Sequence, residues 1–281
     1  MTARRSPTVQ RRRLGTELRH LRDRAGMTIE EVAAALECSH SKVSRIETGQ
    51  VSATPRDVRD ILDLYKVDPR ERDALVQVAR QARQRGWWQA YSDTLVVPLV
   101  GLETDANQIV QYETMVVPGL LQTLDYARAI LRVGRPDLPP QQIERWVEFR
   151  MARQALLTQD HPPAFSTVLE ESVLLRPVGG SSAMRQQLHR LADMAALPTM
   201  TLQVLPLRVG EHVGMSGPFT LYRFANPEDP DVVYLEHPRG DLYLESPEQV
   251  EPYGSAFERL RALALSTEDS VTLIASLARE L

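Results

Sequence analysis

Apolar side chains recur with helical spacing along the first third of the chain. Three leucines spaced by four and three residues predict a helix over residues 8–25. Four more stretches repeat this spacing behind a capping residue or a proline, and their helices are expected to begin at about Thr28, His40, Pro55 and Pro69. Five helices with short connections predict a compact module over residues 1–85.

The pattern becomes mixed in residues 86–281. Helical spacing continues over residues 86–160, where we expect helices at residues 101–117, from Thr123 or Asp125 onward, and at 141–159. Behind residue 161, short apolar runs predict strands at residues 165–169, 200–206, 219–224, 231–236 and 242–245. Further helices are expected from Ser181 or Ser182 to Leu197, and at residues 247–265 and 267–281.

This order of elements predicts an α+β protein. One strand-helix-strand unit followed by closely spaced strands indicates a mixed sheet, in which a parallel pair is extended by antiparallel neighbours. The expected organisation is a five-helix domain over residues 1–85 and a second, larger domain over residues 86–281. Within the second domain, residues 86–160 are expected to be helical and 161–281 to hold the sheet with its helices.

Residues 27–50 contain two short predicted helices joined by a tight turn. Thr28 and Glu31 have the spacing of a capping box, Ser39 is a good N-cap, and Gly49 follows the second helix as a C′ glycine. The second helix buries two apolar residues and leaves polar and basic side chains outside. Such a helix can enter the major groove of DNA.

Each outer residue of these helices has an expected role on DNA. His40, Ser41 and Arg45 would face base edges, where Arg45 can bond guanine O6 and N7. Lys42 and Ser44 would serve bases or phosphates, and Thr28 and Gln50 would position the module on phosphates. The complete candidate set is Thr28, Ser39, His40, Ser41, Lys42, Ser44, Arg45 and Gln50.

Residues 10–70 resemble the lambda-repressor/Cro-like, or xenobiotic-response-element (XRE), helix-turn-helix domains. The resemblance rests on Ala33, Leu36, Val43, Ile46 and the ending Arg45-Ile46-Glu47-Thr48-Gly49-Gln50. Two positions depart from the family pattern. Ile29 stands where the family usually has a glutamine that contacts phosphate, and Glu37 stands at a turn position usually held by glycine.

The resemblance implies a structural ion pair and a dimer. In the family an arginine at the position of Arg22 often pairs with the glutamate near the end of the recognition helix, which is Glu47 here. Small modules of this kind usually bind a two-fold operator as homodimers, so double-stranded DNA and a second copy are the expected partners.

Charge separates the two parts of the chain. The net charge of −4 combines +6 over residues 1–85 with −10 over the remainder. A basic module on an acidic body fits DNA binding by one part and a different task for the other. The single cysteine, Cys38, excludes an internal disulfide framework. No apolar run has the length of a membrane span and no secretory signal precedes the module, so we expect a cytoplasmic protein that joins the nucleoid when bound to DNA.

A second resemblance covers residues 86–265. These residues resemble the C-terminal domain of a large group of actinobacterial regulators, often described as antitoxin-like or as similar to the WhiJ regulator. The resemblance implies a transcriptional regulator, with a small protein encoded by a neighbouring gene as a further partner. It rests on the segments GWWQAYSDTL, YETMVVPGLLQTLDYARAIL, RPVGGSSAM, LQVLP, GMSGPFTL and VVYLE.

Two places in the second domain are candidate ligand or partner sites. Trp87, Trp88 and Tyr91 lie at the domain join, where they would either pack two units together or form an aromatic wall of a pocket. His212 lies in a glycine-rich loop at residues 210–218, which is either a contact surface or a flexible connection between strands. The pair Glu170-Glu171 is expected to end a strand in solvent.

No catalytic constellation is found in the sequence. The six histidines lack metal-ligand spacing, and neither a nucleophile elbow nor a phosphate-binding loop is present, so we expect no enzyme, no metal and no cofactor. The preferred hypothesis is a sequence-specific DNA-binding transcriptional regulator whose C-terminal domain senses a partner protein or small ligand. The alternative is an antitoxin-like interaction protein that mainly binds a small partner and regulates its own synthesis.

Overall fold

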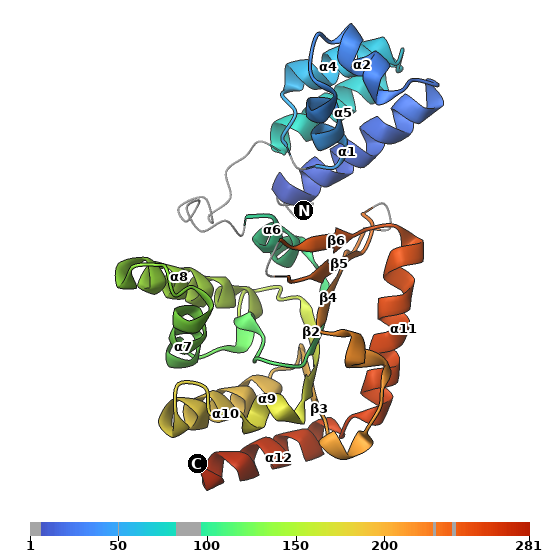
Figure 1. The fold of residues 1–281 in the computed structure, drawn as a ribbon. Coiled ribbons are helices and arrows are strands. Elements are labelled where there is room, and N and C mark those ends of the chain that lie inside the picture. The colour runs from blue at the N-terminus through green and yellow to red at the C-terminus, as the bar shows by residue number, and fades with distance from the viewer. Residues whose placement is uncertain (1–6, 50, 83–96, 227–228, 238–239) are drawn as a thin grey trace. The chain divides into compact units, whose positions relative to one another are not determined.

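The computed structural model describes residues 7–49, 51–82, 97–226, 229–237 and 240–281 (Figure 1). The chain divides into two compact units, unit 1 over residues 1–105 and unit 2 over residues 106–281. The domain boundary expected at residues 85 and 86 lies outside the described residues.

The described part of unit 1 is helical, and its helices begin where the sequence supplies a cap. Thr28, Ser39 and Thr54 each accept a hydrogen bond from the backbone N–H three residues on, and Glu31 and Asp57 complete capping boxes. The five expected helices are present, and a sixth follows. They are α1 (Pro7–Arg24), α2 (Ile29–Ala35), α3 (His40–Glu47), α4 (Pro55–Leu64), α5 (Pro69–Gln81) and α6 (Val97–Asp105).

The helices α1 to α5 of unit 1 share an apolar core. The three leucines of α1 pack with Val43 and Ile46 of α3 and with residues of the other helices, all nearly inaccessible to water. Burial of these side chains fixes the helices against one another, at about 1.5–3 kcal/mol for each large apolar side chain.

Unit 2 is built on one six-stranded mixed sheet in the order β3-β2-β1-β4-β5-β6. The strands β1, β2 and β3 are parallel, whereas β4, β5 and β6 each run antiparallel to the preceding neighbour in that order. The carboxyl ends of β1, β2 and β3 therefore lie at the same edge of the sheet as the start of β4. The strands are β1 (Gln108–Glu113), β2 (Ala164–Glu170), β3 (Met200–Leu205), β4 (Phe219–Arg223), β5 (Val232–Leu235) and β6 (Leu242–Leu244).

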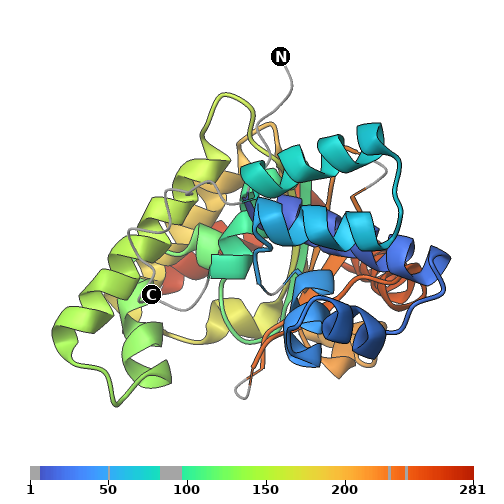
Figure 2. The same cartoon turned by 90° about the horizontal axis from the view of Figure 1, so that it is seen from above.

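Helices cover both faces of this sheet (Figures 1 and 2). The helices α7, α8 and α10 lie on one side, and α11 lies on the other, where it packs on a core that includes Val110, Tyr112 and Phe219. A further helix, α12, packs against α10 and β3. The helices of unit 2 are α7 (Leu124–Gly134), α8 (Pro140–Arg153), α9 (Glu171–Leu175), α10 (Ser181–Ala195), α11 (Pro247–Leu263) and α12 (Thr267–Glu280), with short 3-10 turns at η2 (Gly119–Leu121), η3 (Gln154–Leu157), η4 (Leu207–Val209) and η5 (Val213–Ser216).

The predicted α+β class is confirmed, but the helix expected at residues 101–117 is wrong. The helix α6 ends at Asp105, and residues 108–113 form β1 in the middle of the sheet, so residues 86–160 are not all helical. Ile109 and Val110 fit helical spacing, yet both are β-branched and both are buried, which suits a central strand covered on two faces. Because β1 joins the sheet beside β2, the sheet contains three parallel strands, β1, β2 and β3, where a parallel pair was expected.

Candidate nucleic-acid interface

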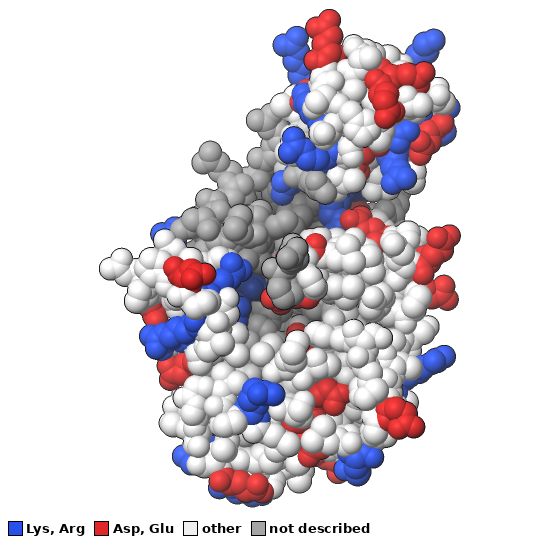
Figure 3. Space-filling view, viewed as in Figure 1, with Lys and Arg blue, Asp and Glu red and all other residues white. Residues whose placement is uncertain are grey.

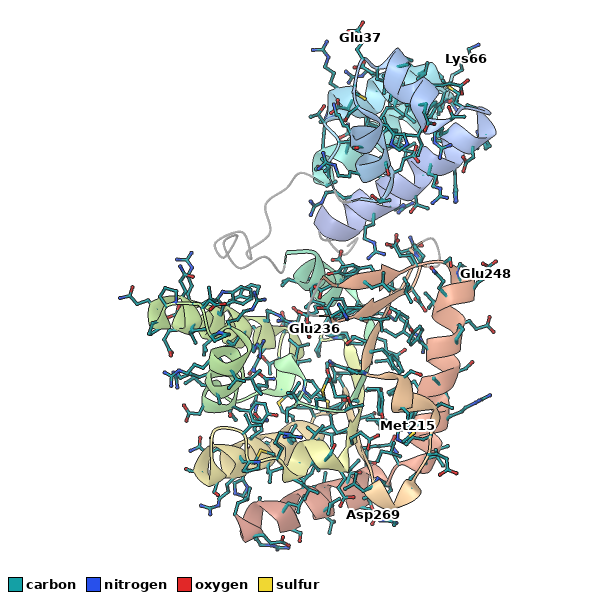
Figure 4. The ribbon with its side chains drawn as sticks, viewed as in Figure 1. Glu37, Lys66, Met215, Glu236, Glu248 and Asp269 are labelled. Carbon is teal, nitrogen blue, oxygen red and sulfur yellow. The ribbon has the colours of Figure 1, made fainter. Side chains whose placement is uncertain are left out.

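The turn between α2 and α3 is closed by a left-handed residue. Glu37 has φ = 51°, and the N–H groups of Glu37 and Cys38 donate to the carbonyls of Ala34 and Ala33 at 3.2 and 2.9 Å. These two bonds form the Schellman motif that ends many helices, usually with glycine at the left-handed position. Glu37 therefore adopts the left-handed backbone conformation for which the family usually has glycine at this turn position. Figure 4 labels it on the outside of unit 1.

The outer surface of α3 carries His40, Ser41 and Arg45, which are all exposed. Arg45 donates from Nε to the carbonyl of Ser41 at 3.3 Å, a bond that folds the stem of the side chain along the helix. His40 Nε2 lies 3.2 Å from Glu30 Oε1 on α2. His40 and Ser41 lie in the first turn of α3, the part of the helix that reads base edges in helix-turn-helix proteins, and Arg45 lies in the last turn.

Lys42 is held by the protein itself. Its Nζ lies 2.9 Å from Asp57 Oδ1 on α4, and this bond raises the pKa of Lys42. Burial alone would raise the pKa of Asp57, but the bonds from Thr54 and Lys42 outweigh it and lower that pKa. A phosphate contact by Lys42 would compete with Asp57, a residue that the sequence pattern did not bring into the site.

The remaining DNA candidates serve partly as caps. The hydroxyls of Thr28 and Ser39 accept the N–H of Glu31 and of Lys42, both at 3.2 Å. The carbonyl of Ser44, a half-buried residue, accepts a bond from the Thr48 hydroxyl at 2.9 Å. Gln50 lies outside the described residues, as do Trp87, Trp88 and Tyr91.

Arg22 and Glu47 form a buried ion pair with two parallel hydrogen bonds. Arg22 Nε lies 2.8 Å from Glu47 Oε1 and Nη2 lies 3.0 Å from Oε2. Each residue is 8% exposed. Arg22 Nη1 also donates to the carbonyl of Met27 at 2.9 Å, and the bond to Glu47 raises the pKa of Arg22. One guanidinium thus joins α1 to the end of α3 and to the segment that begins α2, which fixes the angle of the recognition helix.

Gly15 allows α1 to approach the end of α3 closely. A Cβ atom at this position would lie 2.5 Å from the carbonyl oxygen of Glu47 and 2.6 Å from that of Ile46. Both neighbours are backbone atoms, so a side chain would force the helices apart. This role has no signature in the sequence, since a glycine inside a helix usually only weakens the helix.

In unit 2, His212 belongs to a buried polar cluster. Its Nε2 lies 3.1 Å from Glu170 Oε1, and its Nδ1 accepts the N–H of Gly214 at 3.2 Å. The Tyr112 hydroxyl donates to the same Glu170 oxygen at 2.5 Å, and burial together with Glu170 raises the pKa of Tyr112. Glu170 is 8% exposed, so the expectation that it ends its strand in solvent is wrong. Both nitrogens of His212 are occupied, and the side chain anchors its loop to the sheet.

The described residues form neither a candidate metal centre nor a helix that could span a membrane. Within them no group of three or more histidine, cysteine, aspartate and glutamate side chains is arranged to hold a metal ion. Over the same part of the chain, no helix combines the length and apolar character needed to cross a membrane.

Two family models match the chain. A helix-turn-helix domain matches residues 13–75, and the domain of unknown function DUF5753 matches residues 96–276. No curated protein and no solved structure matches the chain.

The geometry and the first match together define the class of protein. The chain contains a capped helix pair that is fixed by a buried ion pair and exposes polar and basic side chains, and this pair lies within the matched helix-turn-helix domain. The protein is therefore a DNA-binding regulator of the helix-turn-helix class. The second match spans more than half of the residues, and the chain therefore belongs to the DUF5753 family.

Proposed function

We propose that the protein is a sequence-specific transcriptional regulator that binds operator DNA through α3 as a homodimer. The observation that carries this proposal is the surface of α3, where His40, Ser41 and Arg45 are exposed on a helix whose inner face is locked by Glu47. A bidentate contact from Arg45 to guanine would contribute about 1–3 kcal/mol of discrimination between bases.

The test begins with selection of a binding site from random duplex DNA by the full-length protein. Arg45→Ala is expected to lose the preference for the selected site and to keep weak binding that depends on salt, because phosphate contacts carry no sequence information. Arg185→Ala, which removes the same charge from an exposed position on α10, is the matched control and should footprint like the wild type. An Arg45→Ala footprint identical to that of the wild type would falsify the assignment.

We further propose that unit 2 receives the signal that controls DNA binding, from a partner protein or a small ligand. Its net acidity favours a protein partner over a nucleic acid. The alternative, an antitoxin-like protein whose main task is to hold a small partner, differs in what it predicts for the cell.

The two functions can be separated with the tagged full-length protein in its own host. A regulator should cross-link to chromosomal sites whether or not the neighbouring gene is present. An antitoxin-like protein should retain the small neighbouring product at equal stoichiometry, and its loss should be harmful only while that product is made. An XRE-type, WhiJ-like regulator should be found mainly on the nucleoid.

A further inference from the structure

The exposed large hydrophobic side chains of the described residues all lie in unit 2. Several of them follow the carboxyl ends of the parallel strands or lie in the loop that leads to β4, so they share one edge of the sheet. Large exposed apolar groups gathered at one place mark interaction sites. We call this set the carboxyl-edge surface, and it consists of Met115, Leu175, Leu207, Val213 and Met215.

Hydrogen bonds join the segments that carry these side chains. The hydroxyl of Ser172 in α9 donates to the carbonyl of Thr114 at 3.2 Å, and the N–H of Leu207 donates to Glu171 Oε2 at 2.8 Å. The turn after β1, the helix α9 after β2 and the turn after β3 are therefore adjacent. Met115, Leu175 and Leu207 lie on one connected framework.

The loop that carries Val213 and Met215 is anchored to the same framework. His212 bonds to Glu170 at the end of β2, and a Cβ at Gly214 would lie 2.5 Å from the ring of Tyr112, so the loop backbone lies directly on the sheet. Met215, labelled in Figure 4, is 71% exposed although its neighbours are fixed. A surface that is ordered before binding loses little conformational entropy on association.

The charges beside this surface favour a second copy of the same chain. Arg208 and Glu211 are both exposed and lie at either end of one short segment. In a two-fold contact, Arg208 of one copy can face Glu211 of the other copy, and the symmetry repeats this contact in reverse. A neighbouring pair of opposite charges is therefore complementary to the same pair on a second copy. The visible face of unit 2 in Figure 3 likewise carries both signs, scattered over an uncharged background.

We infer that the carboxyl-edge surface is the face through which two copies of this protein pair. This inference rests on the proposed function, since a two-fold operator requires a dimer. It also fits unit 1, whose described residues expose no large hydrophobic side chain and so offer no comparable surface.

The test measures the mass of the full-length protein in solution by sedimentation equilibrium. The wild type should show twice the chain mass of 31.7 kDa at micromolar concentration. The double variant L207E/M215E should weaken pairing by at least about 100-fold, because it places four like charges in the contact. Val133→Glu is the matched control, since Val133 is 83% exposed on α7 and should tolerate the charge without change in mass.

A charge-swap series keeps the test independent of folding. Arg208→Glu and Glu211→Arg should each weaken the dimer, and R208E/E211R should restore it. Monomeric wild-type protein, a dimeric L207E/M215E variant, or a monomer that pairs only with a different protein would each overturn the inference.

DNA binding separates this inference from the proposed function. L207E/M215E should lose affinity for a paired site and keep the affinity of the wild type for one half-site, whereas Arg45→Ala should stay dimeric. A dimeric wild type that binds no DNA would remove the proposed function and leave the pairing surface intact.

Discussion

Glu37 and Lys66 hold a left-handed backbone without being glycine. Their φ values are 51° and 56°, and each closes the end of a helix with the same pair of hydrogen bonds (Figure 4). Neither side chain compensates with an ion pair among the described residues. Each position therefore stores conformational strain on the order of 1 kcal/mol.

Glycine at these positions should stabilise unit 1. Glu37→Gly is expected to raise the free energy of unfolding by about 0.5–1 kcal/mol, because glycine adopts the left-handed region without strain. Gly26→Ala is the reverse control, since Gly26 has φ = 69° with no neighbour within 4 Å, and it should destabilise by a similar amount. Urea denaturation of the three proteins gives the comparison, and a loss of stability in Glu37→Gly would contradict the strain.

Glu113 should make the stability of unit 2 depend on pH. Burial first, and then the charge of Glu236, raise the pKa of Glu113 from 4.5 to about 8. The folded protein thus binds a proton that the unfolded chain releases between these values. The contribution of Glu113 to the free energy of unfolding should therefore be greatest below pH 4.5. It should fall by at most ~1.4 kcal/mol per pH unit as the pH rises to 8, and it should be constant above that pH.

The matching substitution is Glu113→Gln. It keeps the shape of the side chain and removes its titration, so the variant should unfold at a higher urea concentration than the wild type at pH 8 and at a similar one near pH 5. Glu148→Gln removes an equal charge from an exposed position on α8 and should retain the slope of the wild type. The interpretation fails if Glu113→Gln leaves the slope unchanged.

At the scale of elements, the contact of α1 with the end of α3 positions the recognition helix. Gly15→Ala would place a methyl group within 2.5 Å of a backbone oxygen, which no side-chain movement can relieve. We expect a loss of about 1–3 kcal/mol, the usual effect of overpacking, together with weaker operator binding as α3 is displaced. Gly134→Ala, at the end of α7 with nothing within 4 Å, should be neutral or slightly stabilising. Thermal unfolding and gel-shift titration report the two effects.

Helices whose ends are marked by capping residues in the sequence were predictable. Elements whose conformation depends on pairing with distant segments were not. Thr28, Ser39 and Gly49 mark the ends of α2 and α3 within a few residues of sequence, so the motif could be located. The strand β1 could not, because Ile109 and Val110 satisfy two periodicities and the choice is made by β2 and β4 on either side. Local propensity yields to tertiary pairing in such segments.

The site contacts that the sequence did not indicate join residues far apart in the chain. Lys42 and Asp57 are 15 residues apart, and Tyr112 and Glu170 are 58 apart, so neither pair has a local signature. Glu170 follows an apolar run beside a second glutamate, a pattern typical of a strand that ends in solvent. Only the fold shows that a tyrosine and a histidine from other segments enclose it.

At the scale of the whole molecule, separate cores in the two units predict two separate unfolding events. One core in unit 1 is formed by α1 to α5, and one core in unit 2 lies between the sheet and α11. Leu18 and Leu260 are both fully buried, one in each core. Replacing either by alanine removes the same atoms and should cost about 2–5 kcal/mol.

A reciprocal pair of variants tests this independence. In scanning calorimetry of the full-length protein, Leu18→Ala should lower one transition and leave the other in place, and Leu260→Ala should do the opposite. Two-state analysis would then be valid for each unit and not for the chain as a whole. A single transition that both variants lower equally would show that the two units fold as one cooperative body.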